Sequence, residues 1–238
     1  MNEVPKQRWG CVILAIVIGV LAIGCVLKVL IAPYISKYGD QTRGVNNCKG
    51  IILALKYFAK DWGAAYPDVH FPELKSANQV FRELFKAGVV PDERIFGCPE
   101  SMFKPDNDLG VSPHFEKALM PGECHWILLK NQTDVSHLRT PIVIENSLNA
   151  SWPPKWDVSK PSKSWWSKDA NQKRGRTWKG RGIIIGRNDG SVAVEKLRED
   201  GTMDWHSPSN LDDHGKSWID ALTPEQIAKL AYWDIEEK

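Results

Sequence analysis

The sequence has few of the features that define specialised protein classes. It contains a single long uncharged apolar run, which excludes a membrane protein with several spans. Five cysteines in 238 residues are too few for a small disulfide-stapled scaffold. The 31 Lys and Arg are balanced by 29 Asp and Glu, which excludes a polycationic nucleic-acid binder. With 25% charged and 42% hydrophobic residues, the remaining composition is that of a globular protein.

Sequence motifs of common catalytic sites are also missing. There is no G-x-S-x-G, no H-E-x-x-H, no phosphate-binding P-loop and no C-x-x-C. The six histidines have no ligand spacing, and Cys124 and His125 are adjacent, whereas a nucleophile and its base normally meet from distant positions. We therefore expect a protein that is not an enzyme, with no catalytic residue, no bound metal and no cofactor.

The apolar run lies close to the N-terminus. Residues 9–27 carry no charge and form a helix about 28 Å long at 1.5 Å per residue, close to the thickness of a bilayer core. After Lys28 the apolar character continues to Ile35. The run is longer than the roughly 7–15 residues of a cleaved secretory signal and no A-x-A-like site follows it. The sequence predicts a polar leader at 1–8, a retained transmembrane helix at 9–35 and a domain at 36–238.

Two features of this region leave alternatives open. More basic residues follow the run than precede it, so the positive-inside rule weakly places the N-terminus outside the cytoplasm. Residues 21–25 (LAIGC) are loosely similar to a lipoprotein signal, in which Cys25 becomes the acylated first residue. We favour the interpretation in which Cys11 and Cys25 are small apolar residues of the helix.

Two helices are predicted after the membrane segment. Pro33 should kink or break the first helix, with a loosened stretch at 39–44. Ser76 and Gln79 then form a capping-box pattern that predicts a short helix ending before Gly88. Between the loosened stretch at 39–44 and Ser76, apolar residues at steps of three and four predict an amphipathic helix. Its predicted buried face consists of Cys48, Ile51, Ile52, Leu55, Phe58, Ala59 and Trp62.

The rest of the chain is typical of short strands. Residues 126–129 and 141–144 are predicted strands, and 183–185 and 192–194 form a hairpin around Asn188-Asp189-Gly190. A last helix begins at Thr223. Segments 99–123 and 146–180 are predicted long loops. The order of elements indicates an α+β fold, with a long N-terminal helix packed on a small antiparallel sheet.

Several of these segments together resemble a known family. A polar leader ending in Gly10 precedes the apolar helix, and the segments NNCKGIILALKYFAKDWGAAYPD (46–68) and ANQVFRELFKAGVVPDERIFGCP (77–99) follow. This pattern resembles the type IV pilin and type II secretion pseudopilin superfamily. The resemblance implies a subunit or accessory of a type IV pilus or type II secretion filament. It implies an N-terminal helix that contacts the bilayer and like subunits, and a domain outside the cytoplasmic membrane. We expect no specific nucleic-acid partner.

The resemblance also implies a processing site. Members of the superfamily are cut after a glycine, here Gly10, which makes Cys11 the first residue of the mature chain. Ala15 stands where the family carries a glutamate that pairs with the neighbouring subunit's N-terminal amine. The absence of this glutamate favours a second hypothesis, a membrane-tethered binding module that does not polymerise.

A position outside the cytoplasm makes disulfide bonds and calcium sites relevant. Cys98 and Cys124 are the natural pair, because their bond pins the 99–123 loop, whereas Cys48 is predicted to be a buried thiol. Calcium occurs in loops of some pseudopilins, and the oxygen ligands here are in Asp106-Asn107-Asp108 and Asp212-Asp213-His214. Neither run has the spacing of an EF-hand loop, so no metal residue is assigned.

Segment 152–181 is the most unusual in composition. It has five of the eleven tryptophans and a net charge of +7. Interleaved aromatic and cationic residues suit an anionic polymer, either a polysaccharide or a nucleic acid. The alternative, which we favour, is that the tryptophans pack the loop onto the sheet while the lysines face water. The candidate binding residues are Trp152, Trp156, Trp165, Trp166, Lys168, Arg174, Arg176 and Trp178.

Overall fold

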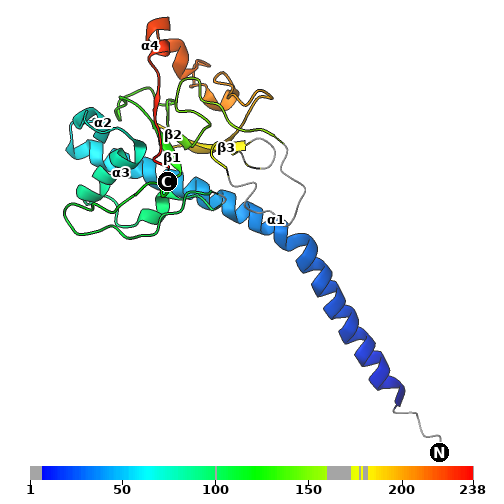
Figure 1. Cartoon of the computed structure of the whole chain (residues 1–238). Coiled ribbons are helices and arrows are strands. Elements are labelled where there is room, and N and C mark those ends of the chain that lie inside the picture. The colour runs from blue at the N-terminus through cyan, green and yellow to red at the C-terminus, as the bar shows by residue number, and fades with distance from the viewer. Residues whose placement is uncertain (1–6, 100, 160–172, 177, 179–181, 238) are drawn as a thin grey trace, which may run out of the picture. The chain divides into compact units, whose positions relative to one another are not determined.

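The computed structural model describes residues 7–99, 101–159, 173–176, 178 and 182–237, except for the side chains of residues 7–12, 15 and 28–38 (Figure 1). The chain forms two compact units, residues 1–42 and residues 43–238.

The longest element is helix α1, Gln7–Asp61, with 55 residues. It continues without interruption through Pro33 and through residues 39–44, so the predicted break is wrong. A proline inside a helix removes one backbone hydrogen bond and bends the axis, and the hydrogen bonds of the neighbouring turns let the helix continue beyond it.

The N-terminal unit contains the first part of α1. The large apolar side chains between Ile13 and Leu27 are exposed there. In the part of the chain that the structure describes, no helix is long and apolar enough to cross a membrane. The predicted span 9–35 extends over side chains outside that part, as do the surroundings of Gly10, Cys11 and Ala15.

In the second unit, α1 has the predicted amphipathic pattern. The side chains of Cys48, Ile51, Ile52, Leu55 and Phe58 are buried, which confirms one apolar face. Trp62 differs from the prediction, because it follows the end of the helix and is 41% exposed, with its ring stacked on Phe58.

Two short helices follow α1. They are α2, Pro67–His70, and α3, Ala77–Lys86. The Ser76 hydroxyl accepts a hydrogen bond from the Gln79 amide at 3.1 Å, as its predicted capping role requires. The Gln79 side chain accepts from the Lys75 amide rather than from Ser76, so only half of the predicted capping box forms. Gly88 follows α3 with a φ of +69°, and the 3-10 turn η1, Glu93–Phe96, comes next.

The sheet has five antiparallel strands in the order β4-β3-β2-β1-β5. The two predicted strands and the hairpin are confirmed. A fifth strand was not predicted, because two residues are too few to show an alternating pattern. The strands are β1 Trp126–Leu129, β2 Pro141–Glu145, β3 Gly182–Arg187, β4 Val192–Lys196 and β5 Tyr232–Trp233.

Short helical turns complete the C-terminal part of the fold. They are η3, Pro208–Asn210, η4, Trp218–Ala221, and α4, Pro224–Ala228. Helix α4 begins as predicted, with a capping box between Thr223 and Gln226. The fold class is α+β.

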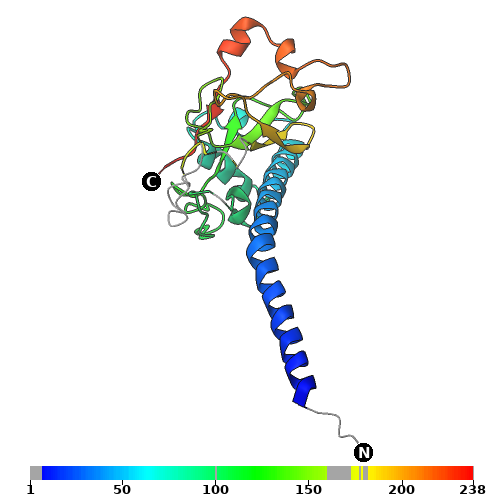
Figure 2. The same ribbon diagram turned by 90° about the vertical axis from the view of Figure 1, so that its right-hand side faces the viewer.

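Two glycines allow the second half of α1 to lie directly on strand β3 (Figures 1 and 2). A Cβ atom at Gly44 in the helix would lie 2.6 Å from Ile184 Cδ1, and one at Gly186 in the strand 2.7 Å from Cys48 Sγ. A side chain at either position would therefore require the neighbouring side chains or the helix to shift.

Candidate functional site

The predicted disulfide between Cys98 and Cys124 is not formed. The Cys124 thiol donates a hydrogen bond to the Trp126 carbonyl oxygen at 3.4 Å, and the Cys98 thiol donates a long one to Glu145 Oε1 at 3.9 Å. It is the side chain of His125, the neighbour of Cys124, that points toward Cys98. Neighbouring side chains in extended backbone point to opposite sides, which directs Cys124 elsewhere.

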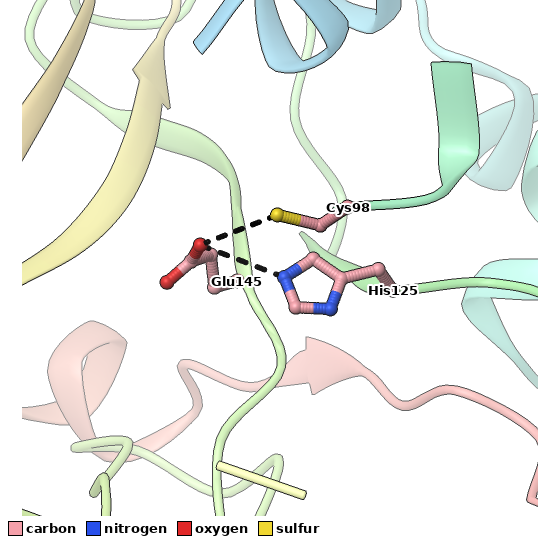
Figure 3. Close-up of side chains that lie close together, drawn as sticks. All are labelled: Cys98, His125 and Glu145. Carbon is pink, nitrogen blue, oxygen red and sulfur yellow. Dashed lines mark hydrogen bonds and ion pairs between the residues drawn. The ribbon is translucent and has the colours of Figure 1, made fainter. Parts of the chain in front are cut away.

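Cys98, His125 and Glu145 form a buried group in which one ligand atom from each residue lies within 4.8 Å of the others (Figure 3). Cys98 follows η1, His125 immediately precedes β1, and Glu145 ends β2. The pairing of Trp126 with Glu145 across these two strands sets the histidine beside the glutamate. Exposed fractions of 4%, 6% and 2% show that the group belongs to the interior.

The imidazole of His125 is held in place from several sides. Its Nδ1 lies 2.7 Å from Ser101 Oγ and 2.9 Å from Asn146 Nδ2. Asn146 Nδ2 also donates to the His125 carbonyl at 3.0 Å, and Asn146 Oδ1 accepts from the Gly175 amide. The ring packs edge-on against Trp126. These contacts point the opposite ring nitrogen, Nε2, at Glu145.

Glu145 is positioned by Trp178, whose indole Nε1 donates a hydrogen bond to Oε1 at 2.6 Å. His125 Nε2 lies 3.6 Å from the same oxygen, which is within ion-pair range but longer than a hydrogen bond. In the part of the chain that the structure describes, His125 Nε2 and Glu145 Oε2 have no hydrogen-bond partner although both are buried. Unsatisfied buried polar atoms cost free energy and require an explanation.

A second group of side chains, all acidic, organises the 99–123 loop. Glu93, Asp106 and Glu123 bring carboxylate oxygens within 4.8 Å of one another. The buried Glu93 carboxylate accepts from the Asn107 amide at 2.8 Å and from the Leu119 amide. Burial, and secondarily the charges of nearby aspartates, raise the pKa of Glu93. Its backbone contacts make Glu93 the residue that holds the loop.

The structure separates the residues of the proposed calcium runs. Asp106 belongs to the acidic group, whereas Asp108 pairs with Lys117 at 2.9 Å. In the second run, Asp212 accepts hydrogen bonds from the amides of His214 and Lys216 in a turn. The expectation that neither run holds a metal stays a prediction.

The described residues of segment 152–181 contact the domain itself. Trp156 and Trp178 are buried, and Trp152 stacks on Trp205 at 4.6 Å. Arg174 pairs with Asp234 and Glu237, and Arg176 pairs with Asp157. These contacts fit the interpretation that the tryptophans pack the loop onto the sheet. Trp165, Trp166 and Lys168 lie outside the described residues.

The largest exposed apolar surface of the described residues is on the N-terminal part of α1. Ten large side chains between residues 13 and 27 are 48–64% exposed. Because they occur at successive positions, at about 100° per residue they surround the helix rather than form one stripe. The side chains are Ile13, Leu14, Ile16, Val17, Ile18, Val20, Leu21, Ile23, Val26 and Leu27.

Comparison of the chain with protein-family models, with curated proteins and with solved structures finds no match.

The sequence contained only a weak signal for the Cys98–His125–Glu145 group. Cys98 and His125 are residue types that bind metals. The separations of 27 residues from Cys98 to His125 and of 20 residues from His125 to Glu145 do not match a ligand motif. The signal that was missed is Glu145, a charged residue directly after the apolar run PIVI, where burial of an acid calls for a partner.

Proposed function

We propose that the protein is a non-enzymatic, pilin-like component of the cell envelope, a subunit or accessory of a type IV pilus or type II secretion filament. Its N-terminal helix is inserted in the cytoplasmic membrane and its domain lies outside the cytoplasm. In this proposal the apolar half of α1 contacts lipid and the corresponding helices of like subunits.

The observation that carries the proposal is the exposed apolar surface of residues 13–27 on a helix that continues into the domain. Each large apolar side chain taken out of water contributes about 1.5–3 kcal/mol. A helix that is apolar on all sides needs a cover on all sides, which a bilayer or a bundle of like helices provides. The amphipathic half of the same helix, packed on an antiparallel sheet, supports the resemblance stated for residues 46–99.

The first test is the mass of the N-terminal peptide of the protein recovered from its native membrane. We expect a chain that begins at Cys11, because Gly10 is at the processing position of the resemblance. A chain that still begins at Met1 contradicts processing and makes a tethered protein that does not polymerise the better description.

A second test measures contact between subunits directly. In a background that carries both Cys11→Ser and Cys25→Ser, single cysteines at positions 16 to 23 are oxidised in native membranes and crosslinked dimers are counted. Packing of like helices predicts crosslinking that peaks every three to four positions. Val135→Cys, on an 80% exposed loop residue of the domain, is the control and should not crosslink. Absence of crosslinks at every helix position contradicts assembly through α1.

A further inference from the structure

We propose that Cys98, His125 and Glu145 form a zinc site that stabilises the domain. The proposal concerns the interior of the second unit and does not depend on membrane insertion or filament assembly. It rests on the identity of the three ligand types, their separations and two buried polar atoms that have no hydrogen-bond partner among the described residues.

The ligand types match zinc. A thiolate, an imidazole nitrogen and a carboxylate are its usual protein ligands, whereas calcium and magnesium bind oxygen atoms. With thiolate and carboxylate both ionised, a divalent cation brings the net charge of the buried group to zero. Neutrality matters here because an uncompensated charge in the interior is costly.

The separations fit a site that closes slightly around an ion. Bonds of about 2.0–2.3 Å in a tetrahedral arrangement separate ligand atoms by roughly 3.3–3.6 Å. Glu145 Oε1 lies 3.6 Å from His125 Nε2 and 3.9 Å from Cys98 Sγ. Movements of a few tenths of an ångström therefore bring Glu145 Oε1 to these separations from the other two ligand atoms, which lie within 4.8 Å of each other.

The ion also accounts for the two unsatisfied atoms. His125 Nε2 becomes a ligand, and the Glu145 carboxylate, which coordinates through Oε1, places Oε2 beside the same ion. With the metal on Nε2, the ring proton is on Nδ1, where Ser101 Oγ accepts it at 2.7 Å. In this tautomer the Asn146 amide nitrogen, 2.9 Å from Nδ1, no longer donates to the ring and keeps its hydrogen bond to the His125 carbonyl oxygen at 3.0 Å.

The surrounding residues support the ligands in the way that metal sites require. Trp178 donates to Glu145 Oε1, and Ser101 faces the non-ligating nitrogen of His125. Gly44 of α1 lies above Cys98, where a Cβ atom would be 3.2 Å from the sulfur. The site thus connects α1, the segment after η1 and two strands of the sheet.

The test uses the purified full chain in detergent after removal of metal by a chelator, titrated with Co²⁺ alone as the spectroscopic probe and then with Zn²⁺. We expect one Co²⁺ per chain with a thiolate-to-cobalt absorption band, which Zn²⁺ abolishes. Zn²⁺ should also raise the thermal midpoint of the wild-type protein.

Three variants make the test specific. Cys98→Ser should lose the thiolate band, and Glu145→Gln should weaken binding on the order of 100-fold or more, since changes even outside the ligands cost about 10–100-fold. Cys124→Ser changes a buried thiol outside the group and should bind as the wild type does. Circular dichroism establishes that each variant is folded.

Two outcomes overturn the proposal. One is that the wild-type protein shows no thiolate-to-cobalt band. Weak binding of Co²⁺ at surface carboxylates, without that band, counts as this outcome. The other is Cys98→Ser protein that binds as tightly as the wild type. If a variant does not fold, the wild-type spectrum and its thermal shift with Zn²⁺ decide.

Discussion

Asp68 is a buried carboxylate whose charge is expensive to maintain. Its Oδ2 accepts hydrogen bonds from the Asn131 amide at 2.7 Å and from the Trp233 indole at 2.9 Å. Oδ1 has no hydrogen-bond partner in the part of the chain that the structure describes. Burial outweighs the two hydrogen bonds and raises the pKa of Asp68 from its ordinary value of 3.8.

This shift predicts a pH dependence of stability. The folded protein keeps the Asp68 proton to a higher pH than the unfolded chain, so the free energy of unfolding decreases as pH rises from 3.8 through the raised pKa. In Asp68→Asn this decrease should be smaller. Denaturant unfolding of the wild type and of Asp68→Asn across that pH range measures the decrease. Glu93, whose pKa is also raised, contributes the same pH dependence to both proteins. Identical slopes contradict the assignment.

Arg187 and Glu195 form an ion pair in the interior of the β3–β4 hairpin. Arg187 Nη2 lies 2.6 Å from Glu195 Oε1 and 2.8 Å from Asn210 Oδ1, and Ser209 donates to the other Glu195 oxygen. Both charged side chains are buried, so each depends on the other to compensate its lost hydration.

Glu195→Ala should therefore destabilise the protein by about 3–5 kcal/mol, because it leaves the Arg187 charge buried without its counter-ion. Asp108→Ala, which removes an exposed partner of Lys117, serves as the control and should change stability little. Denaturant unfolding followed by tryptophan fluorescence measures both. Equal effects of the two changes are inconsistent with this account of the buried pair.

At the scale of elements, the contact between α1 and the sheet depends on glycine in a way that helix propensity does not predict. Alanine is a better helix former than glycine by about 1 kcal/mol at an open position. Gly50 is open, because an added Cβ meets only Ile95, at 3.9 Å. At Gly44 there is no such space, because an added Cβ would lie 2.6 Å from Ile184 Cδ1 and 3.2 Å from Cys98 Sγ.

The two glycines of α1 thus form a matched pair. Gly50→Ala should raise the free energy of unfolding by up to about 1 kcal/mol. Gly44→Ala should lower it by about 1–3 kcal/mol, since the added methyl overpacks the contact with β3. Thermal or denaturant unfolding of the full chain distinguishes them. Stabilisation by both alanines indicates that α1 does not lie on the sheet as closely as described.

At the scale of the whole molecule, the division after Thr42 predicts different behaviour for the two units. A fragment of residues 39–238 keeps the domain core and lacks the exposed apolar surface, so we expect a folded monomer in buffer. The full chain should require detergent, because residues 13–27 otherwise associate with one another. Size-exclusion chromatography with and without detergent tests this. A full chain that is monomeric in buffer contradicts the need for a cover.

How far the sequence determines this protein can be judged from particular elements. The apolar face from Cys48 to Ala59, the Ser76 cap and the β3–β4 hairpin were predictable, because each is encoded by residues close together in the chain. Strand β5 was not, since its two residues form a strand only by pairing with β1. Pro33 predicted a break in the helix, but α1 continues through it.

The cysteines show most clearly where sequence reasoning ends. Composition, the apolar N-terminal run and the α+β order follow from the sequence itself, because local propensity and periodicity act over a few residues. Which side chain Cys98 meets was decided by the register of β1 on β2, which sets His125 beside Glu145 and turns Cys124 away. Long-range strand pairing brings residues 98, 125 and 145 together, and no local pattern records it.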